Sequence, residues 1–363
     1  MNETANQISY RCPNCGGALT FRPDSANYGC AYCGSRFSLK ELEARCGVQE
    51  GAEPDPAGET GEQAAGRDQT EGDLVSYSCP SCGAQILTDE STVATFCYYC
   101  HNTVILSGRL KGAHRPDYVI PFAIDRKKAL SIFSSWIGQK RFVPKSFYDR
   151  QQIDTLSGVY FPYLLYRCDI RAHVDTEGRR VSRTSAGGFE EITTSVYRVK
   201  RDGTLTKAAV ARNALKKRNR LLAEAVQPFD TAALKSFHMS YLSGFVAERK
   251  DLSPDEISGE IEREVREYAG SKLRSQLSEY EGISLGEDNI QVSNGSWSYA
   301  LMPVWTMTYR EKGSDRLYYF SLNGQSGKVV GELPVDRGAL LRYMLFLFAA
   351  VFIPLLALSY FLF

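Results

Sequence analysis

The chain has 363 residues, of which 43% are hydrophobic and 23% charged, and its formal net charge is +1. This composition is typical of a globular protein with two or three domains, and it excludes a wholly disordered chain or a polytopic transporter. The small net charge gives no whole-protein argument for nucleic acid. Ten cysteines are too few for a disulfide-dense secreted scaffold, and residues 1–7 lack a signal-peptide pattern, so we expect a reducing compartment.

Eight of the ten cysteines form one pattern that occurs twice. Each copy has two Cys-x2-Cys pairs separated by 14 residues, and residues 9–16 (SYRCPNCG) align with residues 76–83 (SYSCPSCG). This is an internal duplication. Such pairs suit a tetrahedral metal because each tight knuckle supplies two thiolates. The predicted ligands of the two sites are Cys12, Cys15, Cys30, Cys33, Cys79, Cys82, Cys97 and Cys100.

The pattern predicts two structural zinc sites, with one Zn²⁺ in a ribbon at 9–42 and one Zn²⁺ in a ribbon at 76–109. A ribbon of about thirty residues has almost no core, so metal binding, on the order of 10 kcal/mol, would supply most of its folding energy. Four thiolates leave no open position for water, so hydrolytic zinc chemistry is not expected. Rubredoxin-like iron is the alternative metal, and His101 is either an additional ligand or a solvent-facing residue.

The stretch between the two ribbons is acidic and poor in large apolar residues. Eight acidic residues between Gly47 and Asp73 are opposed only by Arg67. Such a segment cannot bury enough apolar surface to order itself. We therefore predict a disordered acidic linker over 46–73 and two flexibly tethered ribbons.

An α+β domain is predicted over 116–335, because the composition changes there to aromatic and β-branched residues. The sequence leaves open whether it divides into subdomains near 116–226 and 227–335. Its later part reads as a helix followed by an antiparallel meander. In chain order we expect a helix at 125–137 capped by Asp125, a strand from 164 to 175, strands near 192–199 and 204–211, a helix from Pro254 with Ser253 and Glu256 as a capping box, strands at 302–309 and 316–322, and a turn at 323–327 that leads into 328–330.

The C-terminal segment is almost purely apolar. Residues 343–363 carry no charge, and a helix of this length would be about 31 Å long, which matches the hydrocarbon core of a bilayer. We predict a transmembrane helix over 340–363. Arg337 and Arg342 precede the span and no basic residue follows, so the positive-inside rule places the N-terminal region in the cytoplasm of a single-pass membrane protein. The sequence leaves open whether a second helix follows.

The sequence contains no recognised catalytic motif. None of the four histidines stands in a His-Glu-x-x-His pattern, and residues 324–328 lack the spacing of a phosphate loop. Cys168 falls on the apolar side of its strand and is predicted to be a core residue. We therefore expect a non-enzymatic protein with no small-molecule substrate. The basic runs at 126–128 and 212–220 are solvated helix faces or contacts with anionic lipid or an acidic partner.

Several strings beyond the cysteines resemble those of bacterial membrane proteins with duplicated transcription factor IIB-type zinc ribbons, the YdjG type, which are associated with phage-shock protein A. These strings are the two Cys-Pro-x-Cys-Gly knuckles, PDYVIPF (116–122), GVYFPY (158–163), YLSGF (241–245), PVW (303–305) and NGQSGKVVG (323–331). The resemblance implies a cytoplasm-facing membrane protein of the envelope-stress response that brings phage-shock or SPFH-type partners to the membrane. It implies no catalytic residues. In the ribbon alone, such chains are also similar to the primosomal helicase PriA, but this sequence lacks a Walker A loop.

Two functions remain in view from the sequence. The first is a non-enzymatic, membrane-anchored zinc-ribbon adaptor that recruits protein partners at the cytoplasmic membrane. The alternative is a zinc-ribbon regulator that binds nucleic acid while held at the membrane. The ribbons themselves carry few basic residues, which favours protein partners over phosphates.

Overall fold

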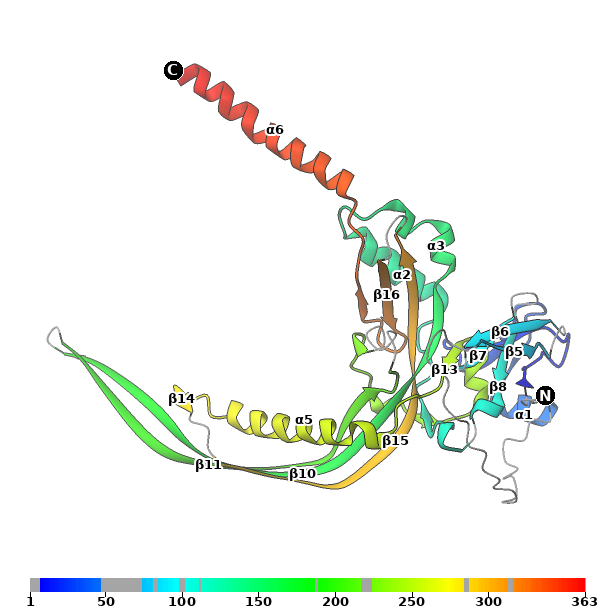
Figure 1. The fold of residues 1–363 in the computed structure, drawn as a ribbon, viewed down its shortest axis with the longest axis horizontal. Helices are drawn as coiled ribbons and strands as arrows, with labels where there is room; N and C mark the ends of the chain where they lie inside the picture. The colour runs from blue at the N-terminus through cyan, green and yellow to red at the C-terminus, as the bar shows by residue number, and fades with distance from the viewer. Residues whose placement is uncertain are drawn as a thin grey trace. The chain divides into compact units, whose positions relative to one another are not determined.

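The computed structural model describes residues 7–46, 74–80, 84–89, 91–97, 102–110, 112–186, 189–216, 224–283, 287–311 and 316–362 (Figure 1). The chain forms two compact units. Unit 1 comprises Met1–Pro162, Lys217–Arg249 and Leu301–Phe363, and unit 2 comprises Tyr163–Lys216 and Lys250–Ala300. Each unit is built from separated stretches, whereas the domains predicted from the sequence follow continuous ones.

The first cysteine-containing region, hereafter ribbon 1, is a small antiparallel sheet followed by a helix. The sheet order is β2-β3-β4, with Leu19 opposite Cys30 and Tyr28 opposite Phe37. Ser38 starts the helix because its hydroxyl accepts the N–H of Glu41 at 3.3 Å while the Glu41 carboxylate accepts the N–H of Ser38 at 2.7 Å. The elements are β1 (Gln7–Ile8), β2 (Leu19–Arg22), β3 (Asn27–Cys30), β4 (Arg36–Phe37) and α1 (Leu39–Cys46).

The second cysteine-containing region, ribbon 2, consists of two antiparallel hairpins. Its second hairpin is part of a larger sheet, because β8 also pairs with β1 and β7 also pairs with β13. The elements are β5 (Leu74–Ser78), β6 (Gln85–Asp89), β7 (Thr92–Phe96) and β8 (Thr103–Leu106), followed by the 3₁₀ turns η1 (Ser107–Leu110) and η2 (Gly112–His114).

The rest of unit 1 is an antiparallel meander covered by helices. Asp125 caps α2 as predicted, since its carboxylate accepts the N–H of Lys128 at 2.7 Å. Phe133 of α2 packs edge-on against Phe320 of β16, with ring centroids 4.8 Å apart. The elements are β9 (Tyr118–Val119), α2 (Arg126–Gly138), η3 (Lys145–Phe147), α3 (Arg150–Asp154), η4 (Thr231–Ala233), β12 (Lys235–Ser236), η5 (Met239–Leu242), β13 (Val246–Glu248), β16 (Leu317–Asn323) and β17 (Val329–Gly331).

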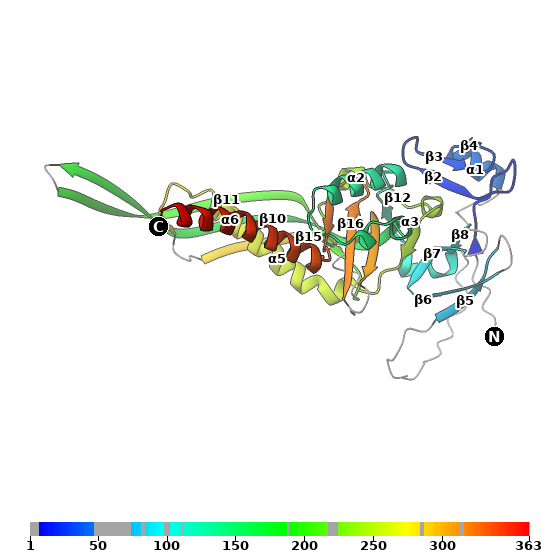
Figure 2. The ribbon, with the colours of Figure 1, turned by 90° about the horizontal axis from the view of Figure 1, so that it is seen from above.

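Unit 2 is a long hairpin packed against a long helix (Figure 2). The inward face of β10 alternates as predicted, and it packs against one apolar stripe of α5. The elements are β10 (Ser157–Ala186), β11 (Phe189–Asn213), α5 (Pro254–Ser275), β14 (Gly282–Ile283) and β15 (Glu287–Arg310), of which β10 and β15 also run into unit 1. The core consists of Leu164, Tyr166, Cys168, Ile170, Ala172, Val174, Ala214, Ile257, Ile261, Val265, Ala269 and Leu273.

Two predictions for unit 2 need correction. The strands expected near 192–199 and 204–211 are one strand, β11, because β10 pairs with it from Phe189 to Asn213, with one register shift between Cys168 and Ile170. The Ser253 side chain makes no capping hydrogen bond, and the Glu256 carboxylate instead pairs with Lys216 at 2.8 Å. The helix itself begins where predicted, with Pro254 at its first turn.

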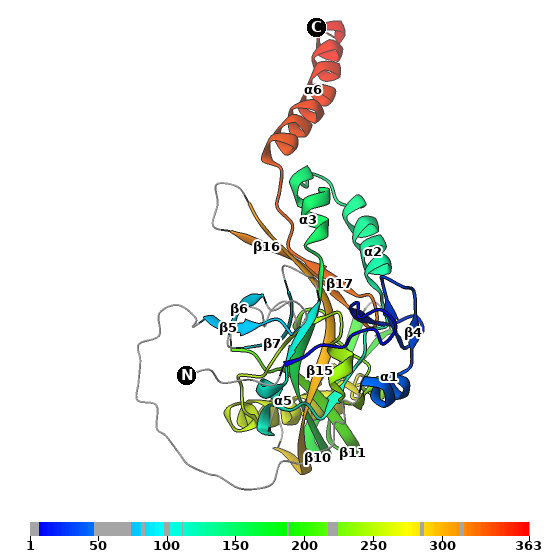
Figure 3. The ribbon, with the colours of Figure 1, turned by 90° about the vertical axis from the view of Figure 1, so that its right-hand side faces the viewer.

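The chain closes with α6 (Arg337–Leu362), which Figure 3 shows as one continuous helix. Asp336 starts it by accepting the N–H of Ala339 at 2.9 Å. Among the described residues, α6 is the one helix that is long and apolar enough to cross a membrane, and none of its apolar stretch is buried in the fold. The prediction for 340–363 thus falls on a helix of suitable length and composition.

Candidate metal centre and the surface that holds it

Ribbon 1 brings four predicted ligands together. The Sγ atoms of Cys12, Cys15, Cys30 and Cys33 all lie within 4.8 Å of one another. Cys12 Sγ is 3.5 Å from Cys33 Sγ, and Cys15 Sγ is 3.5 Å from Cys30 Sγ. Zn–S bonds of about 2.3 Å would place tetrahedral thiolates about 3.8 Å apart. The four sulfur atoms therefore have nearly the spacing of a metal-bound set.

The backbone explains why the sulfur atoms converge. The N–H of Gly16 donates to the carbonyl of Cys12 at 2.8 Å, and the N–H of Gly34 donates to the carbonyl of Cys30 at 3.0 Å. Both glycines have a φ of 73°, a conformation that a side chain disfavours. These two tight turns point both sulfur atoms of each pair into the space between the turns.

The thiols of ribbon 1 differ in their affinity for protons. The hydroxyl and the backbone N–H of Ser35 lower the pKa of Cys33 to about 6. At Cys15 the N–H of Gly17 lowers the pKa, but hydrogen bonds with the thiols of Cys33 and Cys30 outweigh it and raise the pKa to about 12. Negative charge is thus favoured on the Cys33 sulfur and disfavoured on the Cys15 sulfur. A cation among them would remove this difference, because thiolates are the form that binds metal.

Four thiolates with one buried and one exposed sulfur in each pair could hold one metal ion in a closed shell. Soft sulfur ligands in a tetrahedral set suit zinc and iron. The chemistry available to such a site is structural: it cross-links two turns that have little core of their own. The donor set and its spacing therefore fit the metal role that the sequence predicts for this ribbon.

Ribbon 2 is described at two of its four predicted ligands, since Cys82 and Cys100 lie outside the described residues, as does His101. Cys79 and Cys97 are both buried. They belong to one small apolar cluster, which consists of Cys79, Ile86, Cys97, Val104 and Leu106.

The same backbone hydrogen bond occurs at each cysteine knuckle of both ribbons. The N–H of the first cysteine donates to the carbonyl five residues later. The four bonds run from Cys12 to Gly17 at 2.8 Å, from Cys30 to Ser35 at 2.9 Å, from Cys79 to Ala84 at 2.7 Å and from Cys97 to Asn102 at 2.9 Å. The duplication seen in the sequence thus extends to the local geometry of the turns.

Ribbon 1 is docked on residues 240–248, hereafter the docking segment. The Tyr28 hydroxyl lies 2.6 Å from Ser240 Oγ, and both residues are buried. Ser243 makes two further bonds: its hydroxyl donates to the carbonyl of Leu19 at 2.6 Å, and its carbonyl accepts the N–H of Phe21 at 3.0 Å. Buried, fully paired polar groups of this kind fix one geometry.

The same segment also holds ribbon 2. The N–H of Gly244 donates to Thr103 Oγ1 at 2.9 Å, and β13 pairs with β7 with Ala247 opposite Ala94. Arg11 of ribbon 1 donates to the carbonyl of Pro80 in ribbon 2. The expectation of flexibly tethered ribbons is therefore wrong for the described parts of both ribbons, because hydrogen bonds hold each of them to the docking segment. The linker predicted over 46–73 lies outside the described residues except for Cys46, which ends α1.

The sequence strings that carry the family resemblance meet at one aromatic ring. Phe122 stacks on Phe245 with centroids 4.2 Å apart and an interplanar angle of 7°. It also contacts Tyr160 and Trp305, at 5.0 and 5.2 Å between centroids. A Cβ on Gly324 would lie 2.6 Å from the Phe122 ring. Sequence reasoning identified these strings but not their common role, which is to build the core behind the docking segment.

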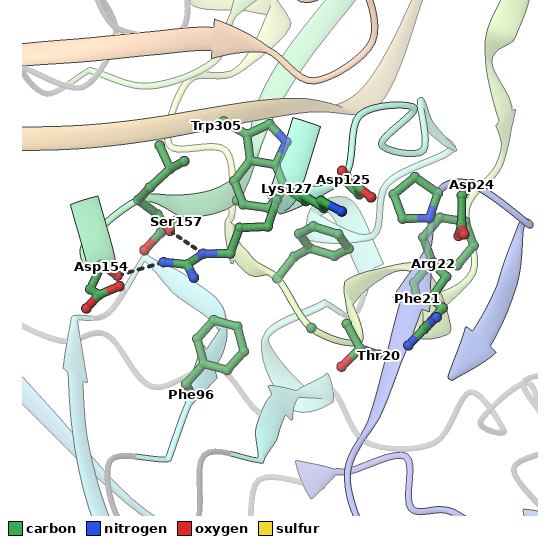
Figure 4. Close-up of a pocket in the computed structure, with 16 residues that line it drawn as sticks. Thr20, Phe21, Arg22, Asp24, Phe96, Asp125, Lys127, Asp154, Ser157 and Trp305 are labelled. Carbon is green, nitrogen blue, oxygen red and sulfur yellow. Dashed lines mark hydrogen bonds between the residues drawn. The ribbon is translucent and has the colours of Figure 1, made fainter. Parts of the chain in front are cut away.

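A pocket of about 760 Å³ lies beside this core (Figure 4). Trp305 and Phe96 lie on opposite sides of it, and Phe245 contributes to its apolar lining. Arg22 and Lys127 also line the pocket and form no ion pair with any described residue. The lining residues are Thr20, Phe21, Arg22, Pro23, Asp24, Phe96, Asp125, Arg126, Lys127, Asp154, Leu156, Ser157, Gly158, Gly244, Phe245 and Trp305.

Backbone carbonyl groups hold the Arg126 side chain at the rim of the pocket. Arg126 donates to the carbonyl of Asp154 at 3.0 Å and to that of Leu156 at 3.4 Å. Ribbon 1, ribbon 2 and the helix-covered meander each contribute to the lining, so the pocket exists only while the ribbons are docked. The sequence offered one signal for it, the basic run at 126–128.

Cys168 lies in the core of unit 2, as predicted. Burial raises the pKa of its thiol, which keeps the thiol protonated and unreactive.

The comparison with known proteins agrees with the resemblance noted from the sequence strings. Over 331 residues the chain is 27% identical to the uncharacterized protein YdjG of Bacillus subtilis (strain 168), and the alignment covers 91% of each chain. No protein-family model matches the chain, and no solved structure is similar to it. The similarity supports the YdjG-type label, and because that relative is uncharacterized it adds nothing on metal, partners or activity.

Proposed function

We propose that this protein is a non-enzymatic, membrane-anchored adaptor that uses its docked zinc ribbons to bind protein partners at the cytoplasmic membrane. Each ribbon holds one Zn²⁺ through four cysteines. The resemblance to YdjG-type proteins directs the proposal toward phage-shock or SPFH-type partners of the bacterial envelope-stress response.

The observation that carries the proposal is the docking of both ribbons on one segment next to an open pocket. Aromatic rings in a pocket can anchor a partner's apolar side chain, and unpaired cations on the rim can select acidic neighbours. Arg22 comes from ribbon 1, and Lys127 comes from α2. A partner seated there would contact the ribbon and the meander together, so the metal would support binding without touching the partner.

Two further observations support the zinc and membrane parts of the proposal. The repeated knuckle hydrogen bonds in ribbon 2 favour a second four-cysteine site of the same design. The apolar stretch of α6 is exposed along its length, which is costly in water and favourable in a bilayer. Arg337 and Arg342 at its start favour a cytoplasmic N-terminal region.

The test is photo- or chemical crosslinking in native membranes, followed by purification of the full chain and mass spectrometry. The rim variant Arg22→Glu with Lys127→Glu should lose the partner crosslinks because both cations of the pocket are reversed. Lys128→Glu is the matched control, since this exposed neighbour does not line the pocket. Cys12→Ser and Cys79→Ser should each reduce the bound zinc from two ions per chain to one, measured by elemental analysis.

Three results would contradict parts of this proposal. Partner recovery that survives both the rim variant and a variant that combines Cys12→Ser with Cys79→Ser would refute the adaptor role of the ribbons. Recovery of nucleic acid that falls steeply with salt would replace the adaptor by the nucleic-acid-binding regulator. A zinc content of one ion per wild-type chain would refute only the second zinc site and would leave the adaptor proposal standing.

A further inference from the structure

The outer strand of unit 2 has an open edge. β11 pairs with β10 from Phe189 to Asn213, and no described strand pairs with its other side. Figure 2 shows β11 following β10 to the end of the hairpin. A free edge presents a row of unpaired backbone N–H and C=O groups, which makes it a template for another strand.

The first part of β11 exposes apolar side chains. Phe189 is 82% exposed, and Ile192 and Val196 are 58% and 59% exposed. The strand contains no proline, and it is 25 residues long, far above the usual length for an edge strand. A long edge with exposed apolar side chains is expected to be covered in the assembled protein.

An apolar groove of about 220 Å³ lies between β11 and α5. Ile170 and Leu273 belong to its apolar wall, while Leu205 and Tyr268 line it with side chains that are 47% and 58% exposed. In a strand added beside β11, alternate side chains would point to the α5 side of the sheet. The groove therefore offers a seat for one such side chain.

The charged side chains along β11 indicate which strand pairs with it. Glu190 and Glu191 stand near its start and form no ion pair with any described residue. Arg198, Lys200 and Arg201 follow near its middle. Arg198 and Lys200 share Asp175, and Arg201 pairs with Glu279, yet the three basic side chains stay 73%, 57% and 40% exposed and can reach a second acid. Two copies of this strand in antiparallel pairing can place Glu190 of each opposite Lys200 of the other, with Glu191 diagonal to Arg201.

We propose that β11 is a dimerisation strand that pairs antiparallel with β11 of a second copy of this chain. In the register centred on Ser195, Glu190 lies opposite Lys200 of the other copy, and Phe189 lies diagonal to Gly203 in the groove wall. The dimer pairs residues 189–201 of both copies around one two-fold axis, so this part of the edge is closed and no further copy adds to it. This inference goes beyond the adaptor function and does not depend on it.

The test uses charge reversal in the full chain, purified in detergent, with mass measured by light scattering. Variant A carries Glu190→Lys and Glu191→Lys, and variant B carries Lys200→Glu and Arg201→Glu. We expect two wild-type chains per particle. The dimer dissociation constant should be at least tenfold higher for A alone or B alone. Mixing differently tagged A and B should restore dimerisation, as a dimer of one A chain and one B chain. One chain that carries all four changes should also dimerise, because its edge is self-complementary again.

The control has the same charge change as A at exposed positions of α5, Glu260→Lys with Glu267→Lys, and it should dimerise like the wild type. Thermal melting of every variant checks that unit 2 stays folded. Undiminished dimerisation of A, or a mixture of A and B that associates no better than A alone, would overturn the proposal. A single wild-type chain per particle, or β11 crosslinked to a different protein in membranes, would overturn it as well.

Discussion

At the scale of single residues, Gly244 is the position where the docking of both ribbons is most sensitive. Its φ is 90°, and its N–H is bonded to Thr103. A Cβ at this position would overlap Thr20 Cγ2 of ribbon 1. Gly244→Ala combines strain at a positive φ with a steric clash, so we expect a loss of more than about 1 kcal/mol in the free energy of unfolding, measured by urea denaturation.

Gly259→Ala is the matched control for that substitution. Gly259 lies in the second turn of α5, and a Cβ there would meet no atom within 4 Å. Alanine should stabilise the helix by about 0.5–1 kcal/mol. Hydrogen exchange of ribbon 1 should increase in Gly244→Ala and stay unchanged in Gly259→Ala. Equal exchange in both variants would contradict the role of Gly244 in docking.

Asp175 provides a pH-dependent contribution on the outer face of the hairpin. Its carboxylate accepts two hydrogen bonds from Arg198, at 2.9 and 2.7 Å, and lies 3.5 Å from Lys200. The Arg198 guanidinium lowers the pKa of Asp175 to about 2. Because the folded pKa lies below the ordinary value of 3.8, this pair stabilises the fold fully above pH 3.8, and the effect disappears as the pH falls toward 2.

The prediction concerns the difference between the wild type and Asp175→Asn. The difference in unfolding free energy should be constant from pH 7 to about pH 4.5 and then shrink toward zero at about pH 2. Using a difference cancels the loss of metal from the thiolates in acid, since both proteins share the ribbons. A difference that is unchanged at pH 2.5 would show that the ion pair is not the cause.

At the scale of elements, two helix starts that look alike in sequence behave differently. Asp125 accepts the N–H of Lys128 at 2.7 Å, whereas the side chain of Ser253 makes no capping bond. We expect Asp125→Ala to cost about 1 kcal/mol and Ser253→Ala less than about 0.5 kcal/mol in denaturant unfolding. Equal costs would show that Ser253 caps α5 in solution.

The hairpin of unit 2 shows how a partner strand overrides local breaks. The sequence predicted one strand near 192–199 and another near 204–211, but β11 runs through Gly203 between them because Ala172 of β10 lies opposite. The irregularity occurs at Lys207, whose φ is 56° and whose N–H is accepted by Asp169 at 2.8 Å. A bulge of this kind depends on the register with β10, which no local pattern specifies.

At the scale of the whole molecule, the proposed membrane anchor rests on α6. A variant that ends at Asp336 should move from the membrane pellet to the soluble fraction, because no other described helix is apolar enough to span a bilayer. Alkaline carbonate extraction of the full chain tests the same point, and it should leave the protein in the pellet. Release of the full chain by carbonate would contradict the anchor.

Tertiary contacts give the ribbons a different arrangement from the one expected from the sequence. The acidic stretch between them suggested two independent modules on a tether, since local composition describes only the linker. The hydrogen bonds of Ser240 and Ser243 to ribbon 1, and of Gly244 to ribbon 2, come from a segment more than a hundred residues away. Composition carries no information on such pairings.

The features that depend on local spacing and composition follow from the sequence alone. The cysteine spacing predicts the four-sulfur cluster of ribbon 1, the alternation of residues 164–175 predicts the inner face of β10, and the uncharged C-terminal segment predicts α6. These features follow from short-range geometry and solvation. The docking segment, the pocket and the open edge of β11 were decided by the tertiary structure alone, because each depends on residues far apart in the chain whose pairing only a closed core can specify.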